Sequence, residues 1–550
     1  MSKIVFKPYS QGQLVLFPTN LDERIAMDSP VRLVDRIVNE LDISELIRTY
    51  EKEGAPSYHP RMLLKVVFYA YMNNVYSCRK IAKAMDENIH YMWLSGDQHP
   101  SFSTINRFRS NHCKECVNEL FSQVVMLLVE MGHISLDTVY VDGTKIESVA
   151  NKYTFVWRKN VERHKGNLEK KIHSILSQIE EGIAQDNAAG AEEGFTPIDS
   201  EELRRRIKEL NRQQSEDNPT KEQRKQIREL EKHEKKLQEY EMHLDILGNR
   251  NSYSKTDPSA TFMRMKEDEM NNGQTKPGYN IQVGTENQFI TNFGIYPNPG
   301  DTTTLSSFLC LYQARLEKLP GELCADAGYG SEENYKLLED NNIEAFVKYN
   351  YFHKEQKNTF KNNPFLQDNL YYNEEKDFFV CPMGQHMNYA GSRKTVSGNG
   401  FVSEISLYRA QNCQACPLRG LCHKSKDNRQ INVNHPLREY KRKARERLTS
   451  PEGLNHRSKR PIEPEAVFGQ VKFNKQYDRF RHKGFDKVNM DFAILVMAFN
   501  LQKLHNKIVK QGEKTGYTGE STEKTFIIVF LLVLLLKRIN LPVEEEKNAA

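Results

Sequence analysis

Two short β-type runs in this sequence each stop at an aspartate that is followed by glycine or by Ala-Gly. In TVYVDGTKIES, within residues 134–148, the apolar run stops at Asp142, and GELCADAGYGS, residues 321–331, places Asp326 in the same way. The carboxyl edge of a sheet is where open α/β folds bind ligands, and a glycine beside the acid lets a substrate approach closely. One such acid could be an ordinary cap, but two of them favour a site on an α/β sheet.

Further segments fill in the sheet around these acids. Residues 278–296 carry two β-type runs on either side of GTENQ, which predicts a hairpin, and IEAFVKY, residues 343–349, is another strand. Helices are expected at 303–318 and 331–340, between and after the strands.

The N-terminal part of the chain, residues 1–130, is expected to be an all-α domain. Amphipathic helices are predicted at 59–75 and 77–94, and a third helix follows. The last two are compatible with a helix-turn-helix, in which Arg107 and Arg109 lie near the start of the recognition helix and contact DNA. A plain helical bundle is the alternative.

Two insertions are expected within the α/β part, residues 131–507. Residues 161–245 are very polar, and their few apolar positions form narrow seams typical of a long antiparallel helical hairpin or a short coiled coil. Those positions are Leu168, Ile172, Ile175, Ile179, Leu203, Ile207, Leu210, Ile227, Leu230, Leu237 and Leu244. Residues 350–435 are expected to be irregular and small, with four cysteines. Residues 508–550 form a polar tether and an apolar tail.

A third acid for a metal site is offered by RPIEPEAVFGQVKFN, residues 460–474. Glu465 and Lys472 are seven residues apart, so we expect both on one face of a helix that starts near Pro464. Glu463 is the alternative acid, but it would face away from Lys472. Three carboxylates without histidine or thiolate form a hard-oxygen site suited to Mg²⁺ or Mn²⁺. Two such ions about 4 Å apart would activate a water or a 3′-hydroxyl and stabilise the leaving oxygen of a phosphodiester.

The order of these motifs carries a family resemblance. With VYVDGTKIESVANKYTFVW, then KPGYNIQV, then ADAGYGS, then IEPEAVFGQVKFN and YDRFRHKG, the chain resembles the DDE transposases of bacterial insertion sequences over roughly residues 10–505. The resemblance implies a ribonuclease H-like mixed sheet flanked by helices. It implies Asp142 on the first strand, Asp326 on the fourth and Glu465 on a late helix as catalytic, metal-binding acids. It also implies Lys472 as a contact to the DNA of the element ends.

A related signature of such enzymes is Y-x2-R-x3-E-x6-K. Glu465 and Lys472 match its last part, whereas Arg460 lies five residues before Glu465 and Ser458 stands where the tyrosine would be.

Basic stretches with aromatic residues surround this signature. REYKRKARERL (438–448), NHRSKRP and YDRFRHKG suit contacts to phosphates, with a solvated helix face as the alternative for the first of them. We expect Arg460, Arg479 and Arg481 to contact DNA.

Nine cysteines fall into two groups. The late group has a C-x2-C knuckle and turn-like CPMG and CPLRG, which predicts a structural zinc site with His423 as a competing ligand. Reduced free thiols in a surface insertion are the alternative. Its members are Cys381, Cys413, Cys416 and Cys422. The others lie within helix or strand patterns and are expected to be packed, namely Cys78, Cys113, Cys116, Cys310 and Cys324.

The terminal segments and the net charge indicate where in the cell the protein is expected. A formal net charge of +5 does not by itself establish a polyanionic partner. MSKIVFKPYSQGQ is no signal peptide, and the apolar run 526–536 is shorter than the roughly 20 residues that span a bilayer. We expect a bacterial cytoplasmic protein without a membrane partner, associated with the nucleoid when it acts. The apolar run is either a buried segment, part of a dimer interface, or a tail that the function does not need, and we favour the last of these.

The function expected from these features is that of a transposase. It would bind the ends of an insertion sequence and its target DNA, and would cleave and transfer DNA strands with metal ions. Because two ends must be brought together, we expect a homodimer or a larger synaptic assembly. The alternatives are a catalytically inactive DNA-binding regulator and a metal-dependent nuclease that only hydrolyses DNA.

Overall fold

The structure is a computed structural model that describes residues 20–50, 56–184, 198–216, 221–265 and 273–514. It divides into two compact units. One comprises Met1–Leu136, Glu286–Thr291 and Asn489–Ala550, and the other comprises Asp137–Thr285 and Asn292–Val488. The expected apolar tail, 526–536, lies outside the described residues. Within the described part, no helix is long and apolar enough to cross a membrane.

The first unit is helical, as expected for the N-terminal part. Its helices are α1 (Pro30–Glu40), α2 (Ser44–Arg48), α3 (Pro60–Met72), α4 (Cys78–Glu87), α5 (Ile89–Ser95), α6 (Phe102–Arg107) and α7 (Lys114–Glu130), with the 3-10 helix η1 (Leu21–Arg24) before them and the π-helix η2 (Phe108–Cys113) between the last two. Most of α19 (Phe485–Lys514) belongs to the same unit. Its Asn500 exchanges two hydrogen bonds of 2.9 Å with the backbone of Ile290.

The second unit is built on a mixed sheet. Its strands lie in the order β4-β5-β1-β7-β8, and β6 pairs with β5. The strands are β1 (Thr138–Glu147), β4 (Thr261–Arg264), β5 (Thr275–Glu286), β6 (Phe289–Tyr296), β7 (Glu322–Ala325) and β8 (Glu344–Val347). β1 runs antiparallel to β5 and parallel to β7, and β7 runs parallel to β8. Leaving β4 aside, this is a ribonuclease H-like sheet, with β7 fourth along the chain.

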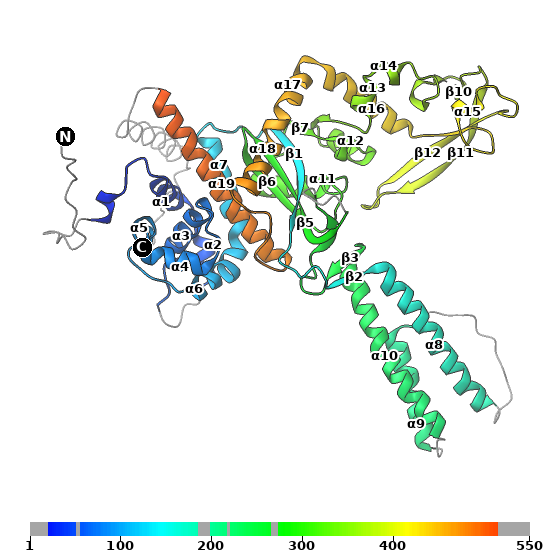
Figure 1. Cartoon of the computed structure of the whole chain (residues 1–550), viewed down its shortest axis with the longest axis horizontal. Helices are drawn as coiled ribbons and strands as arrows, with labels where there is room; N and C mark the ends of the chain where they lie inside the picture. Colours follow the sequence, from blue (N-terminus) through cyan, green and yellow to red (C-terminus); the bar gives the residue numbers. More distant parts are fainter. Residues whose placement is uncertain (1–19, 51–55, 185–197, 217–220, 266–272, 515–550) are drawn as a thin grey trace, which may run out of the picture. The chain divides into compact units, whose positions relative to one another are not determined.

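Helices follow the strands of this unit (Figure 1). They are α11 (Leu305–Leu316), α12 (Glu332–Asp340), α16 (His435–Thr449), α17 (Pro451–Lys459), the 3-10 helix η5 (Arg460–Ile462) and α18 (Pro464–Gly469), which continues as the π-helix η6 (Gln470–Asn474). The predicted hairpin forms, with its turn at Asn287 and Gln288, which have φ of 52° and 62°. Asn adopts this left-handed backbone conformation more readily than Gln does.

The expectation that the first strand ends at Asp142 is wrong. β1 continues to Glu147, where it still pairs with Gly278 of β5. Only the ladder with β7 stops early, at Tyr140 opposite Cys324. At Asp142, β1 is therefore still paired with β5 but is no longer paired with β7. The sheet is open next to Asp142 only on the side of β7.

The described residues of the polar insertion form three helices rather than the two arms of a hairpin. They are α8 (Arg158–Ala184), α9 (Ser200–Glu216) and α10 (Lys221–Leu247), and both α8 and α9 pack on α10 (Figure 1). The predicted seam forms their core, with Ile172, Leu203, Leu230 and Leu237 fully buried. The short strands β2 (Phe155–Trp157) and β3 (Ser252–Ser254) pair where the insertion leaves and rejoins the chain.

The expectation of an irregular segment at 350–435 is also wrong. It contains a five-stranded antiparallel sheet in the order β13-β12-β11-β10-β9. The strands are β9 (Tyr371–Asn373), β10 (Phe378–Val380), β11 (His386–Val396), β12 (Val402–Ala410) and β13 (Gln430–Val433). β11 is exposed along most of its length, so it lacks the apolar alternation by which a strand is recognised.

Candidate active site

The edge shared by β1 and β7 carries two of the predicted acids. Tyr140 and Cys324 form the last pair of the parallel ladder, so Asp142 and Asp326 lie two residues further along neighbouring strands. Asp142 is 6% exposed, whereas Asp326 is in contact with solvent and caps the short 3-10 helix η3 (Ala327–Tyr329).

Arg460 connects the third acid to the first two. Its guanidinium lies 3.4 Å from a carboxylate oxygen of Asp142, 3.8 Å from one of Asp326 and 3.0 Å from one of Glu465. Glu465 reaches it from the first turn of α18, which opens with Pro464. The Arg460 side chain is 11% exposed, so its charge is largely removed from water and offset by the acids.

A cation surrounded by carboxylate oxygens marks a position that a hard divalent ion suits. Here the cation is the Arg460 guanidinium, and its Nε has no hydrogen-bond partner within the described part of the chain. With the guanidinium among them, the ligand oxygens of the three acids do not lie within 4.8 Å of one another. The donor set contains only oxygen and therefore fits Mg²⁺ or Mn²⁺.

Asp301 supplies a fourth carboxylate, one that the strand-end motifs of the sequence do not predict. Its Oδ1 accepts hydrogen bonds of 2.8 Å from the side-chain amides of Asn280 and Gln282 on β5. A Cβ atom on Gly143 would lie 2.7 Å from the same oxygen, so the glycine after Asp142 leaves room for this group. The signal in the sequence is PGDTTTL, where an acid follows the hairpin shortly before a helix.

Tyr329 lies among these acids and is fully buried. Burial raises its pKa well above the usual value, and the carboxylates of Asp301, Asp142 and Asp326 raise it further. The phenol therefore stays neutral, and its hydroxyl donates to the side-chain oxygen of Gln282.

A second cluster of ligand-type groups lies at the other end of β7. Ligand atoms of Glu322, Glu452 and His456 lie within 4.8 Å of one another. The two ring nitrogens of His456 lie 3.4 Å from Glu322 and 3.0 Å from the hydroxyl of Tyr140. These contacts fasten α17, the helix that leads to Arg460, to the sheet.

Lys472 does not share a face with Glu465, so that prediction is wrong. Lys472 is 8% exposed, whereas Glu465 is exposed. α18 ends at Gly469, and the wider turns of η6 change the direction of the following side chains. The structure thus places Lys472 inside the protein rather than on a surface that DNA could reach.

The two arginines of YDRFRHKG differ in their surroundings. Arg479 donates to the backbone oxygens of Ser148 at 3.1 Å and Ala150 at 3.4 Å, while half of its side chain is exposed. Arg481 is exposed. Their contacts with DNA stay predictions.

The two arginines expected on a recognition helix also differ. Arg107 is exposed at the end of α6, as such a contact requires. Arg109 is 3% exposed, and it donates to the hydroxyl of Tyr71 at 2.6 Å, to Tyr76 O at 3.1 Å and to Cys78 Sγ at 2.9 Å. The expected DNA contact of Arg109 is therefore wrong, because the π-helix η2 turns this side chain into the core.

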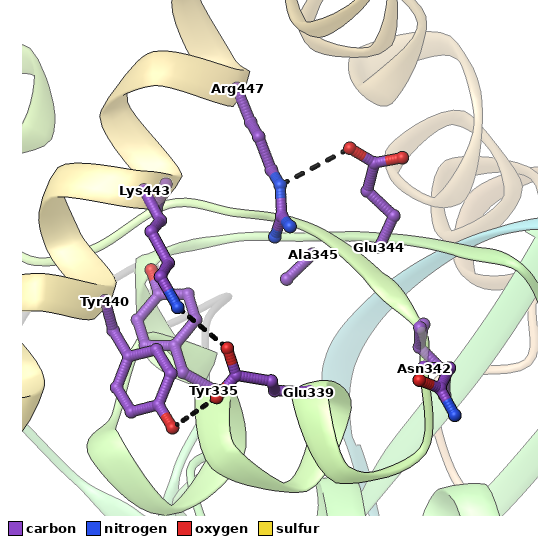
Figure 2. Close-up of a pocket in the computed structure, with 10 residues that line it drawn as sticks. Tyr335, Glu339, Asn342, Glu344, Ala345, Tyr440, Lys443 and Arg447 are labelled. Atoms are coloured by element: carbon purple, nitrogen blue, oxygen red, sulfur yellow. Dashed lines mark hydrogen bonds and ion pairs between the residues drawn. The ribbon is translucent and has the colours of Figure 1, made fainter.

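The basic stretch 438–448 lies on α16, and acids of the same unit pair with much of its charge. Figure 2 shows Tyr440 and Lys443 reaching Glu339 of α12, and Arg447 reaching Glu344 of β8, around a pocket. The Lys443 and Arg447 ion pairs measure 2.8 and 3.3 Å. Further pairs join Arg442 to Glu439 and Glu446, and Arg445 to Glu355. These contacts favour a structural role for the stretch.

The four late cysteines line one cavity at the end of the second sheet, together with His423 and Arg429. The guanidinium of Arg429 donates to Cys422 Sγ at 3.0 Å, and its backbone N–H donates to Cys413 Sγ at 3.3 Å. Both ring nitrogens of His423 are buried without a hydrogen-bond partner in the described part. No three of these ligand atoms lie within 4.8 Å of one another.

The remaining cysteines are mostly packed, as expected. Cys113, Cys116 and Cys324 are buried, and Cys78 is partly buried. Cys310 is exposed on α11, so the expectation is wrong for this residue.

Comparisons with known proteins give two matches. Residues 380–505 match the family model described as transposase DDE domain, and residues 19–111 match the one described as transposase domain (DUF772). The first stretch contains Arg460 and Glu465, and the second contains α1 to α6. No curated protein matches the chain.

Proposed function

We propose that this chain is a DDE transposase of insertion-sequence type, because residues 380–505 and 19–111 match models of transposase domains. It would bind the ends of an insertion sequence and catalyse metal-dependent cleavage and transfer of DNA strands. Its target would be a second DNA, and it would act on the nucleoid in the bacterial cytoplasm. Because two ends must be held together, it would work as a homodimer or a larger synaptic assembly.

The convergence of Asp142, Asp326 and Glu465 on one guanidinium carries the catalytic part of this proposal. Three acids from two strands and a distant helix would repel one another without a positive charge. Glu465 meets Arg460 directly at 3.0 Å, whereas Glu463 is buried at the N-cap of α18. This difference supports Glu465 as the third catalytic acid.

The three acids would hold Mg²⁺ or Mn²⁺, which when bound activates a water or 3′-hydroxyl and stabilises the charge on the leaving oxygen. Asp142 is fixed inside the sheet, and Gly143 next to it leaves the space that Asp301 occupies. Arg460 would hold the acids together before metal binds, and its charge would then be available to a DNA phosphate.

Two alternative functions differ from transposition in ways that can be tested. An inactive DNA-binding regulator would not need three acids around one cation, so their convergence favours an enzyme. A nuclease that only hydrolyses DNA would share the acids but would form no joined products.

The test is metal-dependent cleavage of DNA that carries the ends of the element. Asp142→Asn, Asp326→Asn and Glu465→Gln should each lower cleavage by at least about 10³-fold and leave end binding largely intact. Glu463→Gln is the matched control and should keep most of the activity. Loss of activity in Glu463→Gln but not in Glu465→Gln would reverse the assignment of the third acid.

We also propose a structural zinc ion at the four late cysteines. Thiolates from Cys381, Cys413, Cys416 and Cys422 match the donor set of a closed zinc site. His423, with both ring nitrogens unpaired in the described part, is an alternative fourth ligand.

A further inference from the structure

Lys348 lies in register with two of the catalytic acids. Cys324 of β7 pairs with Tyr140 of β1 on one side and with Phe346 of β8 on the other. Two residues further along the three neighbouring strands come Asp142, Asp326 and Lys348. Since alternate residues of a strand share a face, this row places Lys348 next to Asp326, with Asp142 on the other side of Asp326.

The backbone around Lys348 is held firmly. Its N–H donates to Ala325 O at 3.2 Å, which extends the β7–β8 ladder to the residue before Asp326. A Cβ atom on Gly330 would clash with the carbonyl oxygen of Lys348, so the loop after Asp326 packs directly on it. Val347 and Tyr349 on either side are buried. The position of Lys348 is therefore fixed by the fold.

The charged groups around Lys348 are those of the active site. Burial lowers the pKa of this half-buried lysine, the guanidinium groups of Arg460 and Arg457 lower it further, and the carboxylates of Asp326 and Glu465 raise it. Within the described part, its ammonium makes no ion pair and donates no hydrogen bond. By contrast, Lys443 and Arg447 of nearby α16 are paired with acids.

We propose that Lys348 binds a phosphate of the DNA strand held at the catalytic acids. This inference rests on the proposed function. A phosphodiester brought to these carboxylates adds negative charge to an already acidic edge, and the ammonium beside Asp326 offsets it. A lysine is suited to this as a compact point charge with three donors. Because no group of the described residues takes up those donors, they are available to the non-bridging oxygens.

The test compares Lys348→Met with Lys361→Met, an exposed lysine of the helix α14 (Asn358–Lys361) that loses the same charge. Lys348→Met should lower the rate of end cleavage about 10- to 100-fold, whereas Lys361→Met should not. It should also reduce the slope of log affinity against log salt by about 0.9, the effect of one phosphate contact. Lys348→Arg should restore most of both.

The phosphate itself can be located with DNA in which single phosphates at the cleavage site are replaced by neutral methylphosphonates. One replacement should slow the wild-type protein but add nothing to the defect of Lys348→Met. If Lys348→Met unfolds, Lys348→Gln serves in its place. If wild-type protein and Lys361→Met cleave the ends and the Lys348 variants cleave equally well with the same salt slope, this inference is wrong and the proposed function stands. If the wild-type protein does not cleave, the proposed function fails first.

Discussion

At the scale of single residues, the charge around Arg460 is unbalanced. One guanidinium faces three carboxylates, of which Asp142 is buried while Asp326 and Glu465 are half exposed. Solvent screens the two exposed acids, so the buried pair of Arg460 with Asp142 dominates the energy. The three carboxylates are thus stabilised by the one positive charge of Arg460, and their remaining negative charge can still attract a metal cation.

Arg460→Ala tests this balance without measuring activity. In the absence of metal the variant should be destabilised by about 2 kcal/mol, because the acids lose their counter-charge. Mg²⁺ should then raise its thermal unfolding midpoint more than that of the wild-type protein, since nothing competes for the site. Arg442→Ala, which removes an exposed arginine of α16, is the control. Equal shifts in all three proteins would contradict this interpretation.

Arg107 and Arg109 should respond in opposite ways. Arg109→Ala leaves a buried network with Tyr71 and Asp491 unpaired and should cost about 3–5 kcal/mol in unfolding free energy. Arg107→Ala should leave stability unchanged and lower the salt slope of end binding by about 0.9. Arg48→Ala on α2 is the control for both measurements. An Arg109→Ala variant as stable as the wild-type protein would contradict the structural role of Arg109. An Arg107→Ala variant with an unchanged salt slope would contradict the DNA contact of Arg107.

Which site residues the sequence predicts depends on how local their signals are. Asp142 and Asp326 each follow an apolar run, and Pro464 indicates where the helix with Glu465 begins. The partners of Asp301 and Arg460 come from distant segments, so no local pattern announces them. Lys472 was misplaced because spacing on a regular helix does not hold across a π-helix.

At the scale of elements, segments with a regular apolar spacing were predicted, whereas exposed strands were not. The seam through Leu168, Leu203 and Leu237 forms a core because its apolar spacing survives in a polar background. The long strand β11 was missed because it buries few side chains. The continuation of β1 past Asp142 was missed because only its partner β5 shows that pairing goes on.

The second sheet should depend on zinc. Purified protein should carry one zinc ion per chain, and Cys413→Ser combined with Cys416→Ser should remove it and destabilise the segment from Cys381 to Arg429. Cys310→Ser, at an exposed cysteine on α11, should change neither. Elemental analysis of protein prepared without chelator measures the metal, and limited proteolysis measures the stability. A protein free of zinc would contradict the assignment.

At the scale of the whole molecule, the strand order accounts for the placement of the acids. β7 pairs with β1 although 174 residues separate Glu147 from Glu322, counted as 322 − 147 − 1. The insertion of α8 to α10 fits between them because β2 and β3 bring its two ends together. The grouping of α19 with the N-terminal helices could not be read from the sequence, since it rests on contacts such as Tyr71 with Asp491.

The most direct measurement is a joining reaction with DNA that carries the element's own ends, a second target DNA and Mg²⁺. The wild-type protein should convert end DNA into products covalently joined to the target. Asp326→Asn should bind the ends with similar affinity and form neither cleaved nor joined DNA. Cleavage without joined products would indicate a hydrolytic nuclease, and joined products from Asp326→Asn would contradict the central claim that Asp142, Asp326 and Glu465 form the catalytic site.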